Sequence, residues 1–379
     1  MEIFLNYPRE RSIIFMIICK GEVFMKNMFK KVSLFLMMML CTLALCACGG
    51  DEDVAVDNET EPQTEQQIVI VDRDESELNL LTGEDTLSEE AKGKRPVAVM
   101  VNNIKPAFPQ YGVAQADIIF EVLVEGNQTR FMCLYGDYTQ VPKICSVRSA
   151  RKYFPAISEG FDAIYVHWGM AEPIREYIDS LGLTRFDGND DSNGLYGRDK
   201  DRKAAGYSLE HTGYFDGTKL VEVLEKKDLR TDIEADKNST AFLFNETAVA
   251  PEGEECTKVT VKFGAATAVF DYDEETKTYF KMHNGEPQVD GKEGTQLEFT
   301  NVFVLETDIG VDPNGTHKAV NWYEGTGYYV SNGVAQEIKF MKESEQDRLI
   351  LLDKNGKELS INPGKSYFAI NETGKSVIE

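Results

Sequence analysis

Two stretches decide the fold of this 379-residue chain: RPVAVMVNN at residues 95–103 and ADIIFEVLVEGNQTRFMCL at residues 116–134. The first contains a continuous apolar run, which is typical of a strand buried on both faces. The second begins as another apolar strand, turns at Glu125-Gly126-Asn127 and returns from Arg130 as a third strand. Together they predict a sheet at the centre of a folded domain.

The elements that follow alternate between helix and strand. We expect a helix at 148–158, a buried strand at 162–167, a helix at 172–181 that ends at Gly182, and a last helix at 218–227. This alternation favours a layered α/β domain, with a mixed sheet and helices, over residues 95–238.

The pattern changes after this region. Residues 239–379 consist of short strand-like runs separated by turn signals such as HNG at 283–285, SNG at 331–333 and KNG at 354–356. The sequence therefore predicts a β-rich C-terminal domain.

The N-terminal region predicts where the protein resides. Residues 25–47 join a basic start to an apolar run that ends in small residues before Cys48, as in a lipoprotein signal peptide. Cys48 is then the lipidated residue, and the alternative of a transmembrane anchor is disfavoured because the apolar run is short. We interpret residues 1–24 as an untranslated upstream extension. Residues 48–94, acidic and almost free of aromatic side chains, predict a disordered tether.

Charge excludes one large class of partners. The chain has 40 basic and 64 acidic side chains, a net charge of -24, whereas a nucleic-acid binder presents a basic surface. We expect a protein held at the extracytoplasmic face of the cell membrane by lipid on Cys48. Its three remaining cysteines beyond the signal fit neither a zinc site nor a disulfide framework, although a bond between Cys133 and Cys145 stays open. We expect no cofactor and no metal.

Arg148 and Arg151 are the first candidate ligand-binding residues. A spacing of three on the predicted helix places both side chains on one face near the helix N-terminus, where backbone amides also favour anions. Two guanidinium groups there are suited to a phosphate or a carboxylate. The competing interpretation is that both arginines form salt bridges with the abundant carboxylates of this chain.

The remaining candidates lie at strand ends and in polar loops. His167 and Trp168 follow the predicted strand at 162–167, where open α/β sheets place their ligands. His167, His211 and Asp162 are the candidate catalytic residues, and Trp168, Arg198 and Asp199 are further candidates for ligand binding. Residues 187–198 alternate oxygen-bearing side chains as a calcium loop does, but Ser192 and Arg198 occupy positions that require Gly and Glu. A solvated loop is therefore favoured there.

Several of these stretches carry a family resemblance. The order RPVAVMVNN, ADIIFEVLVEGNQTRF, VRSAR (147–151), DAIYVHWG (162–169), GRDKDR (197–202) and NPGKSYFAI (362–370) resembles the YerB-like bacterial lipoproteins. The resemblance implies an envelope lipoprotein, mainly of Gram-positive bacteria, with two domains of unknown function and no assigned reaction. Trp168 and the pair Glu210-His211 depart from the family pattern. A looser analogy connects the same order of elements to the LytR–CpsA–Psr phosphotransferases, which hold a polyprenyl pyrophosphate with arginines.

Three hypotheses of function follow. The first is a lipid-anchored, non-enzymatic envelope protein that binds another envelope protein or an anionic or glycan ligand, because no established catalytic signature occurs in the sequence. The alternative is an envelope enzyme, phosphotransferase-like or hydrolase-like, that acts on an anionic or pyrophosphate-linked glycan precursor. That alternative requires Arg148, Arg151, His167 and His211 to share one pocket. A solute-binding transporter component is a third possibility.

Overall fold

The computed structural model describes residues 77–234, 242–313 and 315–379, which all fall into one compact unit. The predictions for the upstream extension, the signal peptide, Cys48 and most of the tether lie outside these residues. None of the helices in the described ranges combines the length and the apolarity that crossing a membrane requires.

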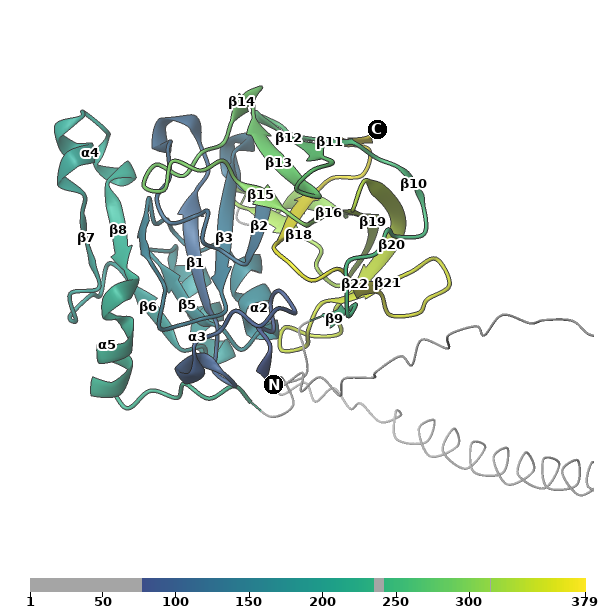
Figure 1. Cartoon of the computed structure of the whole chain (residues 1–379). Helices are drawn as coiled ribbons and strands as arrows, with labels where there is room; N and C mark the ends of the chain where they lie inside the picture. Colours follow the sequence, from purple (N-terminus) through teal and green to yellow (C-terminus); the bar gives the residue numbers. More distant parts are fainter. Residues whose placement is uncertain (1–76, 235–241, 314) are drawn as a thin grey trace, which may run out of the picture. The chain divides into compact units, whose positions relative to one another are not determined.

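A large mixed sheet forms the centre of the unit (Figure 1). Its strands run in the spatial order β10-β20-β19-β16-β23-β2-β3-β1-β5-β6, and β21 extends it beside β20. The first part of the chain supplies β1 (Val97–Asn102), β2 (Ile118–Leu123), β3 (Thr129–Tyr135), β5 (Ile164–His167) and β6 (Arg185–Asp187). The later part supplies β10 (Glu254–Glu255), β16 (Asn301–Glu306), β19 (Glu324–Ser331), β20 (Val334–Met341), β21 (Ile350–Leu352) and β23 (Ser366–Asn371).

Strand β23 joins the two predicted domains. It runs parallel to β2 on one side and parallel to β16 on the other, so that Ser366 lies opposite both Ile118 and Asn301. All six residues of β23 are buried. The α/β region and the β-rich region therefore share one continuous sheet.

Apolar side chains on the two faces of this sheet form two cores, as the alternation of side chains along a strand requires. On one face, Val99, Phe131 and Tyr367 pack against a second sheet and α5. On the other, Met100 and Phe368 pack against α2 and α3. The covering elements are α2 (Tyr153–Gly160), α3 (Glu172–Leu181), α5 (Leu220–Lys226), β11 (Lys258–Phe263), β12 (Ala266–Asp273), β13 (Thr278–His283), β14 (Glu286–Pro287), β15 (Glu298–Phe299) and β24 (Ser376–Ile378).

Smaller elements complete the unit. The three-stranded sheet of β4, β8 and β7 lies with α4 at one end of the molecule (Figure 1). These elements and the short pairs elsewhere are β4 (Lys143–Cys145), β7 (Tyr196–Arg198), α4 (Lys200–Ala204), β8 (Gly213–Asp216), β9 (Leu243–Phe244), β17 (Ile309–Val311), β18 (Lys318–Val320) and β22 (Ser360–Ile361), with single-turn helices at Glu89–Ala91, Lys105–Ala107, Glu125–Asn127, Leu209–His211 and Gly217–Lys219.

A buried ion pair crosses the interface between the two sheets. The ammonium of Lys281 on β13 lies 3.7 Å from the Glu121 carboxylate on β2, and both side chains are fully buried. Glu121 also accepts hydrogen bonds from Asn103 and Thr129, each at 2.6 Å, and from the Tyr367 hydroxyl. Burial lowers the pKa of Lys281, although the Glu121 carboxylate opposes that shift. Such a pair is tolerated because nearly every polar atom has a partner.

The predicted fold class is confirmed, with a mixed sheet and helices first and a strand-rich region after it. Two local predictions are wrong. Residues 77–94 pack against the unit, with Leu81 and Ala91 fully buried, so the disordered tether does not extend to residue 94. The helix expected at 148–158 begins only at Tyr153, because the backbone before it hydrogen-bonds to strand ends instead of to itself.

Candidate functional site

The carboxyl ends of β1, β5 and β6 meet at one edge of the central sheet because these three strands are parallel. An extended segment, residues 147–151, crosses this edge. The Arg148 N–H donates to the carbonyl of Met100, and the Arg148 carbonyl accepts from the N–H of Trp168, at 2.9 and 3.0 Å. The segment thereby links β1 to the end of β5, and these bonds fix the backbone positions from which its two arginine side chains extend.

Three guanidinium groups gather along this segment, and we call Arg130, Arg148 and Arg151 the arginine cluster. Arg130 is the second residue of β3, donates to the Ser149 carbonyl at 2.6 Å and lies 3.2 Å from the Glu125 carboxylate. Arg151 also donates to Glu125, with its Nε 2.7 Å from Oε2. One carboxylate thus binds two of the three arginines.

Glu210 pairs with the third arginine. Its carboxylate lies 2.5 Å from Arg148 and 3.7 Å from Nε2 of His211. The amide of Asn102 lies 3.2 Å from Nδ1 of His211, and since that amide nitrogen can only donate, Nδ1 accepts and Nε2 carries the proton. Burial lowers the pKa of His211 despite the neighbouring carboxylate, so this ring is neutral at pH 7.

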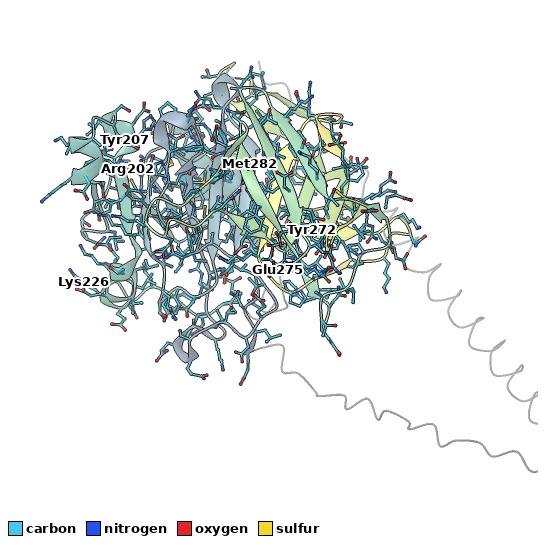
Figure 2. All side chains as sticks on the ribbon, turned by 45° about the horizontal axis from the view of Figure 1, so that its top comes forward. Arg202, Tyr207, Lys226, Tyr272, Glu275 and Met282 are labelled. Carbon is cyan, nitrogen blue, oxygen red and sulfur yellow. The ribbon has the colours of Figure 1, made fainter. Side chains whose placement is uncertain are left out.

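Arg202 fixes the backbone of His211. Its guanidinium is almost completely buried and donates to the carbonyls of Ala107 and His211, at 3.0 Å each. It also lies over the ring of Tyr207, 4.8 Å from the centroid, and Figure 2 labels both residues at the α4 end of the molecule. The position of His211 therefore depends on a buried cation that the sequence did not single out.

The arginine cluster repels itself electrostatically. Burial, and then the nearby Arg148 guanidinium, lower the pKa of Arg130 to about 10. The Tyr165 hydroxyl is buried without a hydrogen-bond partner among the described residues, and burial raises its pKa although Arg130 and Arg151 oppose the shift. Positive charge is thus concentrated near the buried Tyr165 hydroxyl, which has no hydrogen-bond partner among the described residues.

His167 faces a different set of groups. Its Nδ1 lies 3.2 Å from the Gly169 carbonyl and 3.9 Å from the Asp187 carboxylate, and its ring packs 5.3 Å from that of Tyr165. Burial lowers the pKa of His167 to about 4. Its Nε2 is buried without a partner among the described residues. His167 is therefore a neutral, buried ring at pH 7.

The other predicted residues have structural contacts. Asp162 lies before β5, at the opposite end from His167, and binds Arg230 at 2.6 Å and Arg95 at 3.2 Å. Burial alone would raise the pKa of Asp162, but the Arg230 hydrogen bonds and the Arg95 charge lower it below its ordinary value.

Trp168, Arg198 and Asp199 lie near the three-stranded sheet. The Arg198 guanidinium stacks 4.1 Å from the Trp168 ring, which suits a cation–π contact. Asp199 caps α4 by accepting from the Arg202 N–H at 3.0 Å. The structure therefore brings Trp168 and Arg198 together and gives Asp199 a capping role.

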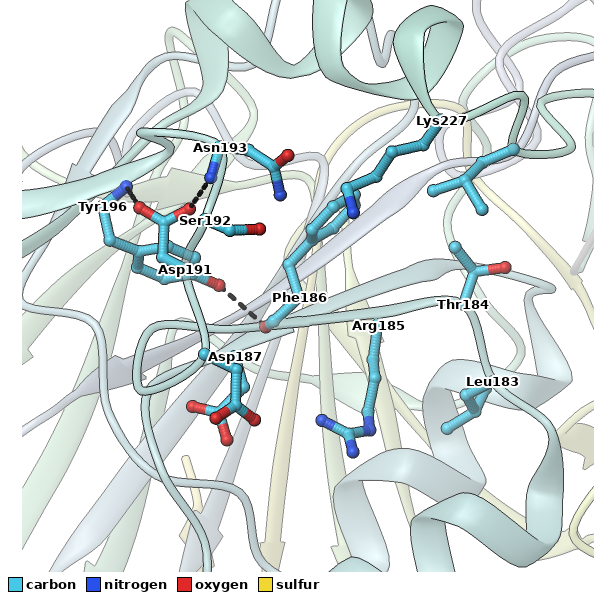
Figure 3. A pocket seen from close by; sticks show the side chains of 12 residues that line it. Leu183, Thr184, Arg185, Phe186, Asp187, Asp191, Ser192, Asn193, Tyr196 and Lys227 are labelled. Atoms are coloured by element: carbon cyan, nitrogen blue, oxygen red, sulfur yellow. Dashed lines mark hydrogen bonds between the residues drawn. The ribbon is translucent and has the colours of Figure 1, made fainter.

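A pocket of about 530 Å³ opens beside β6, and Figure 3 shows its lining. Part of the pocket lining comes from the loop at 187–198, whose sequence resembles a calcium-binding loop. The Asp191 carboxylate accepts from the backbone N–H groups of Asn193 and Tyr196, at 2.9 and 3.0 Å, and the Tyr196 hydroxyl donates to the Phe186 carbonyl at 2.7 Å. Asp191 thus organises the loop backbone. Among the described residues, no group of three or more Asp, Glu, His or Cys side chains is arranged to hold a metal.

The prediction for the two arginines was wrong in its geometry. Arg148 and Arg151 precede α2 and do not share a helix face, and each pairs with a carboxylate, as the competing interpretation expected. The analysis of the sequence missed Arg130, Glu125 and Asn102. The turn at 125–127 was a signal for Arg130, since the antiparallel return from it places Arg130 opposite Val122 and close to Glu125. The register that places Arg130 opposite Asn102 belongs to the pairing of β1 with β3, which that turn does not set.

Fold and site together define a protein in which two sequence regions share a mixed sheet with a charged cluster at its edge. Residues 81–230 match the family described as protein of unknown function (DUF3048), N-terminal domain, and residues 259–368 match its C-terminal domain. A curated Bacillus subtilis (strain 168) protein described as "Putative lipoprotein YerB" is 29% identical over 296 residues, or 76% of this chain and 85% of that protein. The crystal structure of the YerB protein from Bacillus subtilis matches with a TM-score of 0.67 and 26% identity, over 79% of this chain and 98% of that one.

The chain belongs to the YerB-like family, whose two domains are both of unknown function. This confirms the resemblance inferred from the sequence. The description of the Bacillus relative as a lipoprotein supports attachment to a membrane.

Proposed function

We propose that this protein is a lipid-anchored, non-enzymatic binding protein on the extracytoplasmic face of the cell membrane. In this proposal it holds an anionic group of an envelope ligand, a phosphate or a carboxylate, at the arginine cluster. The observation that carries the proposal is the convergence of three guanidinium groups in a protein with a net charge of -24. Crowding like charges in a buried setting costs free energy, and such arrangements concentrate at functional sites.

The two carboxylates of the site explain how an anion would enter. Glu210 is about half exposed and Glu125 about one-third exposed, so both lie at the rim. Each occupies guanidinium donors that a phosphate would bind bidentately. We expect a ligand anion to displace Glu210 from Arg148 first, because this pair is the more exposed of the two.

The same geometry favours binding over a reaction. His167 and His211 contact different groups, so the two histidines do not act together on one site. Among the described residues, neither imidazole ring hydrogen-bonds to a hydroxyl or thiol that could act as a nucleophile, and the Cys145 thiol reaches only the backbone carbonyl of His211, at 3.7 Å.

The test is the titration of the full chain with inorganic phosphate by calorimetry. Glu210→Gln removes the competing carboxylate and keeps the size of the side chain, so phosphate should bind severalfold to about tenfold more tightly, a gain of up to about 1.4 kcal/mol. Arg148→Gln should weaken phosphate binding by at least the same factor.

A control comes from the partly exposed Arg348–Glu358 pair, in which Arg348 precedes β21 and Glu358 follows it. Glu358→Gln should leave phosphate binding unchanged. The proposal is wrong if Glu210→Gln and Glu358→Gln behave alike, or if Arg148→Gln binds phosphate as the parent does.

A further inference from the structure

A groove of about 220 Å³ lies between α2, α3 and the segment that follows the β17–β18 hairpin. Four aromatic residues line it: Tyr153 from α2, Tyr177 from α3, and Trp322 and Tyr323 from the segment after the hairpin. Trp322 is almost completely buried, whereas Tyr323 is 47% exposed, which makes it one of the few large exposed apolar side chains among the described residues. The groove thus presents aromatic surface to solvent.

Polar groups lie at the edges of these rings. The Tyr323 hydroxyl donates to the Glu345 carboxylate at 2.9 Å. The Lys152 ammonium lies 5.1 Å from the centroid of the Tyr177 ring. The indole N–H of Trp322 is buried without a hydrogen-bond partner among the described residues. Donors and acceptors therefore surround an apolar floor.

We infer that this groove binds one sugar ring of a glycan. A sugar ring has apolar C–H faces that pack on aromatic side chains, and a perimeter of hydroxyl groups that both donate and accept hydrogen bonds. A hydrocarbon would desolvate Lys152 and Glu345 without pairing them, which is costly. The volume is below the roughly 300–1,000 Å³ of pockets that hold drug-sized ligands, so it suits a single ring.

The groove adjoins the arginine cluster through Tyr153. This residue lines the groove, and its ring packs 6.3 Å from that of Trp322. Burial raises the pKa of the Tyr153 hydroxyl, and the charges of Arg130 and Arg151 oppose that shift. A glycan whose ring occupies the groove and whose phosphate or carboxylate reaches the arginines would use both sites. The anionic part of this inference rests on the proposed function; the sugar part does not.

The sequence supplies an optical probe for the test. The chain has two tryptophans, Trp168 and Trp322, so in the full chain carrying Trp168→Phe the emission reports on the groove alone. This protein is titrated with the uncharged β-1,4-linked trisaccharide of N-acetylglucosamine. We expect a saturable change at millimolar sugar, and at least tenfold weaker binding in Tyr323→Ala.

Two further variants test whether sugar binding depends on the ring of Tyr323, on its hydroxyl group, or on the loss of any tyrosine. Tyr323→Phe keeps the ring and should bind within a fewfold of the parent. Tyr328→Ala, a half-buried tyrosine on β19 outside the groove, should bind as the parent does. Thermal unfolding of each variant checks that the fold persists.

The inference is overturned if the trisaccharide leaves the emission of Trp322 unchanged, or if Tyr323→Ala and Tyr328→Ala bind it equally. The two proposals fail independently. A loss of trisaccharide binding with intact phosphate effects at Arg148 and Glu210 refutes the sugar groove alone, and the reverse result refutes only the anion site.

Discussion

Lys281→Met should destabilise the protein strongly, because it breaks the buried pair between the two sheets. Both Lys281 and Glu121 are fully buried, with their charged atoms 3.7 Å apart. Removing one partner of a buried pair costs about 3–5 kcal/mol, since the other charge stays in the interior uncompensated. Glu121 would keep its bonds from Asn103, Thr129 and Tyr367, so we expect the lower end, about 3 kcal/mol.

The measurement is urea unfolding followed by circular dichroism, together with thermal melts. With an unfolding entropy of about 2.1 cal/mol/K per residue, a loss of about 3 kcal/mol corresponds to a fall in Tm of roughly 5 °C for a unit of this size. The double variant Glu121→Gln/Lys281→Met removes both charges and keeps a side chain that can bond Asn103 and Thr129. It should recover at least half of the lost free energy of unfolding.

An exposed pair gives the control. Lys258 lies 3.3 Å from Asp271, and both side chains are about half exposed. Lys258→Met should therefore cost less than about 1 kcal/mol. A Lys281→Met protein as stable as the parent, or a double variant weaker than the single one, would refute the view that the pair is ionised and mutually stabilising.

Three other predictions follow from the described contacts. Because the pKa of His167 is about 4 in the folded protein and about 6.5 in the unfolded chain, the unfolded state gains a proton first as pH falls. The free energy of unfolding should therefore drop by about 3 kcal/mol between pH 6.5 and 4, and urea titrations of His167→Gln should show a flatter dependence. Asp162→Asn should lower stability by about 2–4 kcal/mol, because it removes the carboxylate beside the buried Arg95, while Arg230 keeps its pair with Glu234. Phosphate affinity in calorimetry should stay unchanged, and a change in affinity would contradict the assignment of Asp162 to the opposite end of β5. Three buried cysteines, Cys133, Cys145 and Cys256, should not react quickly with a thiol reagent in the native protein. Reaction of any of these three without denaturant would disprove its burial.

Local patterns were sufficient for much of the fold. The apolar run of β1, the β2–β3 hairpin and helix α3 with Gly182 in the left-handed region appear where the sequence predicts them. Each depends on residues close in the chain. A run of apolar side chains, a glycine turn or a helix end can be recognised without knowing what packs against it.

The errors occurred where contacts between residues distant in the sequence determine the backbone conformation or the burial of a side chain. The arginines of segment 147–151 have helical spacing, but the Val147 N–H donates to the Gly213 carbonyl and the Arg148 N–H to that of Met100, which no local pattern reveals. Lys281 looks like a solvent-facing residue in a strand, yet it is buried because Glu121 from a different sheet meets it. Charged side chains are the hardest to place from sequence, since the partner that makes burial tolerable is remote.

The position of β23 has a consequence for how the chain reaches this structure. Until residues 366–371 have been made, β2 and β16 each keep an unpaired edge, because β23 is the strand that lies between them. Exposed edges of this kind invite pairing with other chains, and contacts so distant in sequence form slowly. Growing chains that contain only the first family domain should therefore remain aggregation-prone and dependent on chaperones, and the native sheet should close in one late step that unites both domains at once.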